Sequence, residues 1–306
     1  MTQAQMGQVF DTTSENVLMH LKNIYKTGEL EPDATAKDFL VVRTEGKRRV
    51  KRNLKQNKGL ERVCRFDISR NSDGYSGLKG SCMIPWKLLS RSRTPDNKSE
   101  LTLYQRDTEY SIRVNGQELM NSRMSGSEKM LAELSCPAIA DRKTANVLIG
   151  GLGMGYTLSA ALRLLPSDAD VLLAELVPSV VEWNQNVLGS LAGDPLKDSR
   201  VTVVIEDVVN IINDNTSAFD AILLDVDNGP AGLTQKANVE LYSMSGLSMI
   251  HRALRPGGVV AVWSSSPDIG FIQRLKKSSF HVLEKKVRGR TPKKGPVHTI
   301  WIATKS

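Results

Sequence analysis

The sequence predicts an α/β fold in which a mostly parallel, doubly wound sheet of seven strands occupies the C-terminal part of the chain. Two observations lead to this prediction. From residue 145 onward, short apolar runs of the buried-strand type alternate with helical segments. Such alternation is typical of a parallel sheet with helices on both faces. In addition, a glycine-rich loop, GGLGMG, follows the first of these strands and precedes a helix.

The expected strands are Asn146–Gly150, Ala169–Glu175, Val201–Ile205, Ala221–Asp225, Val259–Trp263, Phe280–Val287 and His298–Ala303. The expected helices are Tyr156–Leu165, Pro178–Leu188, Val208–Asn213, Ala237–Leu254 and Ile269–Lys277. No helical segment separates the last two strands, so we expect them to pair antiparallel.

A small β-rich subdomain is expected at 83–140, ahead of the sheet domain at 141–306. Residues 100–105 and 109–114 alternate apolar and polar side chains, which is the period of a strand. The dipeptide Asn115-Gly116 follows the second run and is favoured in two-residue hairpin turns. A helix is expected from Ser127 to about Leu134.

The N-terminal extension is basic and is expected to fall into two parts, 1–60 and 61–82. An N-capped apolar pattern predicts a helix over 15–25. Residues 61–82 are rich in Ser, Gly, Asp and Arg, which is typical of a linker. The stretch Arg43–Arg70 carries much of the formal net charge of +8. Because Phe66 is the single aromatic residue among these charges, a solvated basic face is favoured, and contact with a nucleic acid stays the alternative.

Composition narrows the class of protein. The chain is 40% hydrophobic and 24% charged, as in ordinary globular proteins. The N-terminus lacks the apolar segment of a signal peptide, and no apolar run approaches the roughly 20 residues of a membrane helix. We therefore expect a cytoplasmic protein without membrane contact. The three cysteines and four histidines are scattered, so no metal site is expected.

The glycine-rich loop is expected to form the first part of a ligand site. Its glycines are Gly150, Gly151, Gly153 and Gly155. Residues without a Cβ atom let the backbone turn sharply and come close to a ligand. This loop alone is weak evidence, since dinucleotide-binding proteins and proteins without any ligand share it.

Acidic residues follow the next three strands. Glu175 lies about 20 residues beyond the loop, where a carboxylate can accept hydrogen bonds from ribose hydroxyls. Asp207 follows the third strand, where an acid can bind the exocyclic amine of adenine, and Asp225 and Asp227 follow the fourth. The carboxyl ends of parallel strands meet at one edge of the sheet, where open α/β sheets bind ligands. Each acid alone could instead cap a helix or a loop.

Five motifs carry a family resemblance: IGGLGMG, AELVPSVVEWN, IEDVVNII, FDAILLDVDNGP and LRPGGVVAVWS. Residues 84–306 resemble spermidine-synthase-like proteins of the class I S-adenosylmethionine-dependent methyltransferase superfamily, which have a Rossmann-like fold. The resemblance implies S-adenosylmethionine, or its decarboxylated form, as cofactor. It further implies that Glu175 binds the ribose, Asp207 the adenine amino group and the Gly150–Gly155 loop the methionine-derived tail. Asp225 matches the family's catalytic aspartate, which accepts a proton from the attacking amine.

A second, shorter resemblance concerns the N-terminus. The stretches Thr12–Leu40 and Val42–Leu54 are similar to the front of RhuM-type virulence and antirepressor-like proteins. The similarity stops there, so we interpret residues 1–60 as a partial segment of that kind and assign it no activity.

The chain departs from true aminopropyltransferases in three places, one of which is the family's DSSDPxGP segment, shortened here to DVDNGP at 225–230. Those enzymes have an aspartate inside the glycine loop, which pairs with the amine of the decarboxylated cofactor, whereas Gly153 stands here. They also have a Tyr-Gln pair where this chain reads Ser125-Gly126-Ser127-Glu128, and only Glu128 agrees. An aspartate in the loop would repel the carboxylate of S-adenosylmethionine. Gly153 removes that repulsion and leaves backbone N–H groups that favour an anion.

From this departure we predict methyl transfer from S-adenosylmethionine to a small-molecule acceptor, with Asp225 and Asp227 as candidate proton acceptors. Two alternatives stay open: a polyamine aminopropyltransferase, and a non-catalytic protein that binds nucleosides or nucleic acid. Tyr242 and Trp263 are candidates for the acceptor pocket, although a purely structural role is favoured for both. Relatives of this shape often form homodimers, so a dimer is possible here.

Overall fold

The computed structural model describes residues 42–45, 48–51, 63–70, 76–226, 240–290 and 294–306. The chain divides into two compact units, Met1–Trp86 and Lys87–Ser306. The helix expected at 15–25 and most of the RhuM-like segment lie outside the described residues. The site predicted from the sequence belongs to the second unit.

The described part of the first unit consists of two antiparallel strand pairs. Strand β1 (Val42–Glu45) pairs with β2 (Arg48–Lys51), and β3 (Val63–Arg70) pairs with β4 (Ser76–Met83). The prediction of a linker over 61–82 is therefore wrong for the residues of β3 and β4. Apolar and polar residues alternate along β3, which is the period of a strand. The serines and glycines that suggested a linker lie mainly between and within the paired strands.

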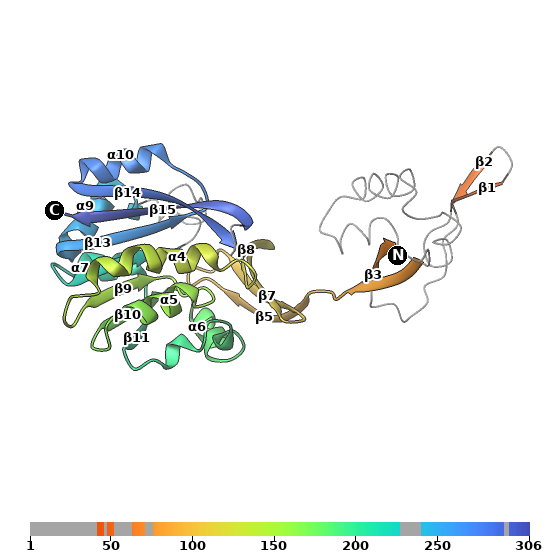
Figure 1. Cartoon of the computed structure of the whole chain (residues 1–306), viewed down its shortest axis with the longest axis horizontal. Coiled ribbons are helices and arrows are strands. Elements are labelled where there is room, and N and C mark those ends of the chain that lie inside the picture. Colours follow the sequence, from red (N-terminus) through yellow and green to blue (C-terminus); the bar gives the residue numbers. More distant parts are fainter. Residues whose placement is uncertain (1–41, 46–47, 52–62, 71–75, 227–239, 291–293) are drawn as a thin grey trace. The chain divides into compact units, whose positions relative to one another are not determined.

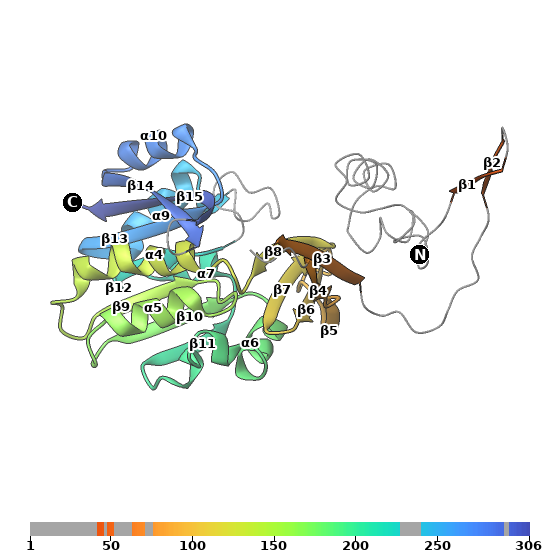
Figure 2. The same ribbon diagram turned by 45° about the vertical axis from the view of Figure 1, so that its right-hand side comes forward.

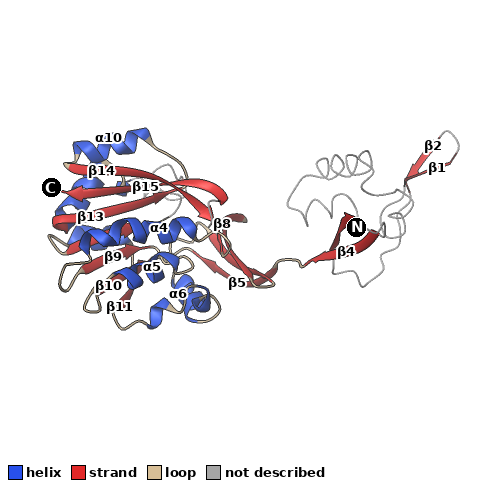
Figure 3. Cartoon of the chain, in the orientation of Figure 1, coloured by secondary structure: helices blue, strands red, loops and turns tan. Residues whose placement is uncertain are grey.

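The second unit begins with a four-stranded antiparallel sheet, which Figure 3 shows as strands and loops. Its strands, in sheet order, are β5 (Lys87–Arg93), β6 (Glu100–Arg106), β7 (Glu109–Val114) and β8 (Gln117–Asn121). Asn115 and Gly116 form the turn between β7 and β8, with φ angles of 50° and 82°. Positive φ at both positions is the type I′ geometry, so the predicted hairpin is confirmed.

A seven-stranded sheet follows, in the order β11-β10-β9-β12-β13-β15-β14. Its strands are β9 (Asn146–Gly150), β10 (Asp170–Glu175), β11 (Val201–Ile205), β12 (Phe219–Leu224), β13 (Leu254–Ser264), β14 (Phe280–Arg290) and β15 (Lys294–Lys305). The first five strands in this order pair parallel, and β15 pairs antiparallel with both β13 and β14. The predicted fold class and the terminal antiparallel pair are confirmed.

Helices cover both faces of this sheet. They are α4 (Gly126–Ser135), α5 (Tyr156–Leu164), α6 (Pro178–Gln185), α7 (Val208–Asp214), α9 (Met244–Ala253) and α10 (Ile269–Lys277). Helices α4, α5 and α6 pack on one face with Ile149, whereas α7, α9 and α10 pack on the other with Leu148. Figures 1 and 2 show α4 and α5 side by side on the first face. No helix in the described ranges has the length and apolar character needed to cross a membrane.

One predicted helix, Ala237–Leu254, differs from the structure, where α9 begins only at Met244. The hydroxyl of Ser243 accepts a hydrogen bond from the backbone N–H of Gly246 at 3.2 Å and so caps the start of α9. A Cβ atom at Gly246 would lie 2.1 Å from the carbonyl oxygen of Leu241. The chain therefore turns tightly before α9, and this turn interrupts the apolar pattern that predicted one long helix.

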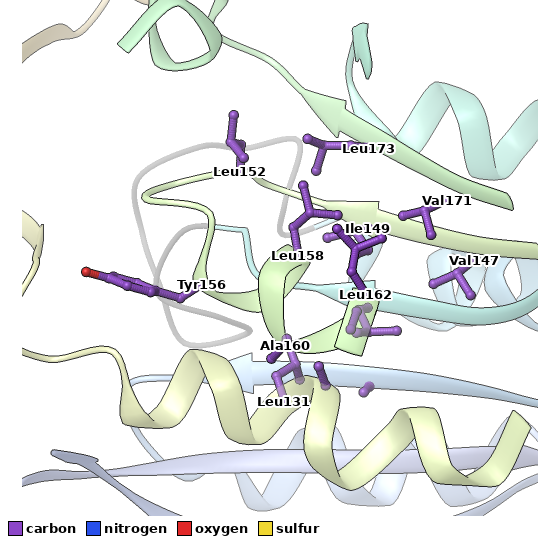
Figure 4. Packing of buried hydrophobic residues seen from close by; sticks show 14 of the residues in the cluster. Leu131, Val147, Ile149, Leu152, Tyr156, Leu158, Ala160, Leu162, Val171 and Leu173 are labelled. Atoms are coloured by element: carbon purple, nitrogen blue, oxygen red, sulfur yellow. The ribbon is translucent and has the colours of Figure 1, made fainter. Parts of the chain in front are cut away.

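The β-rich subdomain and the large sheet share one hydrophobic cluster. Leu103 and Ile112 of the small sheet belong to the same cluster as Leu131 of α4 and Ile149 of β9, and all four side chains are almost completely buried. Figure 4 shows part of this cluster around α5, which contributes Leu158. Burial of each such side chain contributes roughly 2 kcal/mol, so the small sheet is held in place as a wall beside the large one.

A buried carboxylate fixes the amino ends of the central strands. Asp220 of β12 is 2% exposed and binds Arg142 through one oxygen. Its other oxygen accepts hydrogen bonds from Arg255 at 2.7 Å and from the backbone N–H of Asn146 at 2.8 Å. Through these bonds Asp220 joins β9, β12 and the start of β13.

We predict that Asp220→Asn lowers the free energy of unfolding by about 2 kcal/mol, because it leaves two arginines without their buried partner. Urea unfolding of the full chain measures this change. The matched control is Glu100→Gln, which removes the exposed pair Arg91–Glu100 and should cost less than about 0.5 kcal/mol. Equal losses in the two variants would contradict the anchoring role of Asp220.

Candidate active site

A cavity of about 210 Å³ lies at the carboxyl ends of the parallel strands. Five of the residues predicted from the sequence line it: Gly151, Gly153, Glu175, Asp207 and Asp225. Gly150 and Gly155 do not line the cavity, and Asp227 lies outside the described residues. The topology therefore brings most of the predicted site to one edge of the sheet, as expected for an open α/β fold.

The glycine loop brings β9 close to the end of β12. Gly151 has a φ angle of +89°, and a Cβ atom there would lie 2.4 Å from the carbonyl oxygen of Asp225. A larger residue at 151 would force the two strand ends apart. Gly150 ends β9 and Gly155 is the N-cap of α5, so these two glycines support the loop without facing the cavity.

Gly153 faces Met120, which comes from β8 of the small sheet. Gly153 has a φ angle of +52°, and a Cβ atom there would lie 2.7 Å from Cε and 3.0 Å from Sδ of Met120. The thioether therefore occupies the space into which a side chain at 153 would extend. An aspartate at this position would require Met120 to move.

Glu175 is 8% exposed, and its carboxylate binds the backbone of the glycine loop and of the segment that follows β10. Its Oε2 accepts a hydrogen bond from the N–H of Leu152 at 2.9 Å, and its Oε1 accepts one from the N–H of Val177 at 2.9 Å. Two such bonds fix the carboxylate at the cavity wall and fix the glycine loop at the same time.

Asp207 caps a helix, which is the structural alternative that the sequence analysis left open for it. Its Oδ1 accepts a hydrogen bond from the N–H of Val209 at 2.9 Å, at the start of α7. The same side chain lines the cavity, together with the apolar side chains of Leu176, Val177 and Val208. Asp207 thus combines a structural bond with a position beside an apolar slot suited to a flat ring.

Asp225 is paired with a carboxyl group that was not among the predicted site residues. The hydroxyl of Thr157 donates a hydrogen bond to Oδ2 of Asp225 at 2.6 Å and lies 3.1 Å from the carbonyl oxygen of Glu128. Glu128 is 7% exposed and also lines the cavity, where the hydroxyl of Ser127 donates to its Oε2 at 2.8 Å. Two carboxyl groups, linked through Thr157, therefore line the same cavity.

Burial raises the pKa values of both carboxyl groups. Burial raises the pKa of Glu128 to about 7, and the charge of Asp225 adds to the effect. Burial also raises the pKa of Asp225 to about 6, against the opposing effect of the hydrogen bond from Thr157. Because Thr157 stabilises the ionised form of Asp225, we assign the remaining proton to Glu128 near neutral pH. Ionisable groups with raised pKa values in a cavity are typical of functional sites.

The two aromatic candidates for the acceptor pocket, Tyr242 and Trp263, lie in different surroundings. Tyr242 packs edge-on against Phe271 in the core, 5.5 Å between ring centroids, and does not line the cavity. Trp263 does line it, while it also packs against the core cluster. His298 lies beside Trp263 and was missed, because nothing near it in the sequence marks it. Glu128 had one signal, its agreement with the family's motif.

The charges of the cavity wall are of one sign. Five carboxyl side chains line it: Glu128, Glu175, Glu206, Asp207 and Asp225. Among the residues that the structure describes, no lysine or arginine lines it. Within the same described part, no three Asp, Glu, His or Cys side chains gather into a possible metal site. A ligand with positive charge suits this wall.

Fold and cavity together define a Rossmann-like α/β protein with a ligand site at the carboxyl edge of its sheet. The chain belongs to the spermine/spermidine synthase domain family, whose sequence model matches residues 125–294.

Curated relatives match shorter stretches. The polyamine aminopropyltransferase of Mycobacterium tuberculosis is 29% identical over 134 residues, which are 43% of this chain and 24% of that protein. Polyamine aminopropyltransferase 2 of Pseudomonas aeruginosa is 32% identical over 135 residues, 40% of this chain and 34% of that protein. The polyamine aminopropyltransferase of a Thermoanaerobacter species is 28% identical over 145 residues, which are 46% of this chain and 49% of that protein. The matches thus span between a quarter and half of these relatives.

Solved structures share the fold. The spermidine synthase of Thermotoga maritima superimposes with a TM-score of 0.57 at 17% identity, over 84% of this chain and 83% of that chain. A spermidine synthase in complex with the transition state analogue AdoDATO gives the same values.

We predict that Glu128→Gln stabilises the protein at high pH relative to the natural chain. The folded state raises both pKa values of the pair, so the stability due to bound protons is present below about pH 4. It is lost as the pH rises through about 6 to 7. Glutamine carries no charge at either pH. From pH 5 to pH 8, the free energy of unfolding of the Glu128→Gln variant should therefore increase by about 2 kcal/mol relative to that of the natural chain.

Urea unfolding at both pH values measures the difference. Glu133→Gln, on the exposed side of the same helix, is the matched control and should follow the natural chain at both pH values. If Glu128→Gln did so too, Glu128 would not be a buried carboxyl with a raised pKa.

Proposed function

We propose that this protein transfers an aminopropyl group from decarboxylated S-adenosylmethionine to an amine. One observation carries the proposal: the cavity wall presents five carboxyl groups and, among described residues, no lysine or arginine. The decarboxylated cofactor bears a sulfonium and an ammonium, and the acceptor is an amine. Each of these groups is favoured by a negative wall, whereas the carboxylate of intact S-adenosylmethionine would meet no cation there.

The lining fits the cofactor. Glu175 lines the cavity at the position expected for the ribose, and Asp207 lines it together with the apolar side chains of Leu176 and Val208, which suit adenine. Gly151 lets the loop backbone approach Asp225, and both residues line the cavity. When bound, the cofactor supplies a carbon activated by its positive sulfur. This chain's task is to bind, orient and exclude water.

Asp225 is the proton acceptor in this proposal. An amine attacks only after it loses a proton, and Asp225 is the carboxylate that the Thr157 hydroxyl holds ionised. Glu128 lies next to it and adds negative charge as the pH rises through its raised pKa of about 7. The pair therefore attracts the ammonium form of the acceptor and then accepts its proton. The names of the curated relatives, polyamine aminopropyltransferases, support the same reaction.

Methyl transfer from S-adenosylmethionine, the reaction first predicted, remains the second candidate because of one specific contact. Met120 fills the space beside Gly153, so the loop has no room for the carboxylate that pairs with the cofactor's amine in true aminopropyltransferases. The comparisons with relatives favour aminopropyl transfer over this reaction.

Product mass distinguishes the two reactions. Full-length protein is incubated with 1,4-diaminobutane and either form of the cofactor, and the products are analysed by mass spectrometry. We expect an added aminopropyl group with the decarboxylated cofactor and no methylated product with the intact one. A methylated product alone would replace the proposal by its second candidate, and retention of neither cofactor would leave only the fold.

We further predict that Asp225→Asn reduces turnover by about 100-fold or more, as expected for loss of a general base, while cofactor affinity changes little. Glu175→Gln should do the reverse and weaken cofactor binding about tenfold, because one acceptor oxygen is lost. Calorimetry measures affinity and the transfer assay measures turnover. Glu182→Gln, an exposed acid on α6, is the control. If Asp225→Asn kept full turnover, Asp225 would not be the proton acceptor.

A further inference from the structure

The features of the cavity follow the order of the strands. In sheet order, β11 is followed by Asp207, β10 ends in Glu175, β9 leads into Gly151, β12 is followed by Asp225, β13 contains Trp263 and β15 contains His298. If the nucleoside lies over β11 and β10, the reacting groups lie at β9 and β12. The strands next to these, β13 and β15, then contribute the wall that faces the acceptor.

Trp263 and His298 form an aromatic pair at that wall. Their ring centroids are 4.8 Å apart and their planes are inclined by 31°. Register explains the contact, because Trp263 pairs with Ile300 and the chain of β15 reaches His298 two residues earlier. Both side chains line the cavity.

Each ring has a nitrogen that lacks a hydrogen bond. Nε1 of Trp263 and Nδ1 of His298 are buried and have no partner among the described residues. A buried donor or acceptor without a partner is costly, and native proteins contain few of them. Two such atoms on neighbouring side chains of one cavity indicate a polar group of a ligand.

The chemistry of the two nitrogens restricts that group. Indole N–H only donates, so it needs an oxygen or nitrogen with a lone pair. Burial lowers the pKa of His298, and a neutral imidazole offers one donor and one acceptor. A hydroxyl or a carboxamide can satisfy both nitrogens at once. An ammonium could lie over the rings by cation–π attraction, but it has no lone pair and would leave the indole N–H unpaired.

We infer that Trp263 and His298 select the acceptor, and that the acceptor is an amine whose far end carries a neutral hydrogen-bonding group such as a hydroxyl or a carboxamide. This inference rests on the proposed function, since it assumes that Asp225 and Glu128 bind the amine end. It distinguishes this chain's acceptor from a linear diamine, whose far end is a second ammonium.

Equilibrium binding tests the inference without relying on turnover. Calorimetry on the full chain, saturated with 5′-methylthioadenosine, compares 4-aminobutan-1-ol, butylamine and 1,4-diaminobutane. We expect the amino alcohol to bind about tenfold more tightly than butylamine and more tightly than the diamine. Trp263→Phe and His298→Phe keep a ring and remove the nitrogens, and each should reduce this preference to about twofold or less. Trp183→Phe makes the same change in a core tryptophan outside the lining and should keep it.

The inference is overturned if the natural chain binds the amino alcohol no better than butylamine, if it prefers the diamine, or if Trp263→Phe keeps the preference. The transfer assay with the decarboxylated cofactor separates this failure from that of the proposed function. Transfer to all three amines without the preference would overturn the inference alone. The preference in binding, with transfer to none of the amines, would overturn the proposed function alone.

Discussion

The hydrogen bond from Thr157 to Asp225 is the interaction on which the site depends. It links the start of α5 to the end of β12, and the same hydroxyl lies against the backbone of α4 at Glu128. This arrangement is possible because Gly151 lets β9 come within contact distance of Asp225, so that α5 begins within reach of the carboxylate. A single hydroxyl thus stabilises the ionised form of one acid next to a second acid that is buried.

The acidic residues at the two ends of β12 have opposite electrostatic surroundings. At its amino end, Asp220 is balanced by Arg142 and Arg255, and the cluster supports the fold. At its carboxyl end, Asp225 lines the cavity together with Glu128, and no described lysine or arginine lines it. Unbalanced buried charge costs folding free energy. Its presence at one end only is typical of a site where a positively charged ligand supplies the balance.

Several elements besides the acid-bearing strands complete the cavity. The small sheet contributes Met120, which takes the space beside Gly153, and the last strands contribute Trp263 and His298. One fold can serve different ligands when such lining residues differ.

The sequence by itself determined the fold class, the order of the elements and four of the strand ends that carry the site, because strand and helix periods and glycine turns are local properties. It also placed Gly151, Glu175, Asp207 and Asp225 at one edge. Only the tertiary structure decided that Glu128 lies against Asp225 and that Trp263 meets His298. These partners are far apart in the chain, and their contacts follow from how α4 packs on the sheet and how β15 returns beside β13. Their pKa values and missing hydrogen bonds depend on that packing, which no local pattern encodes.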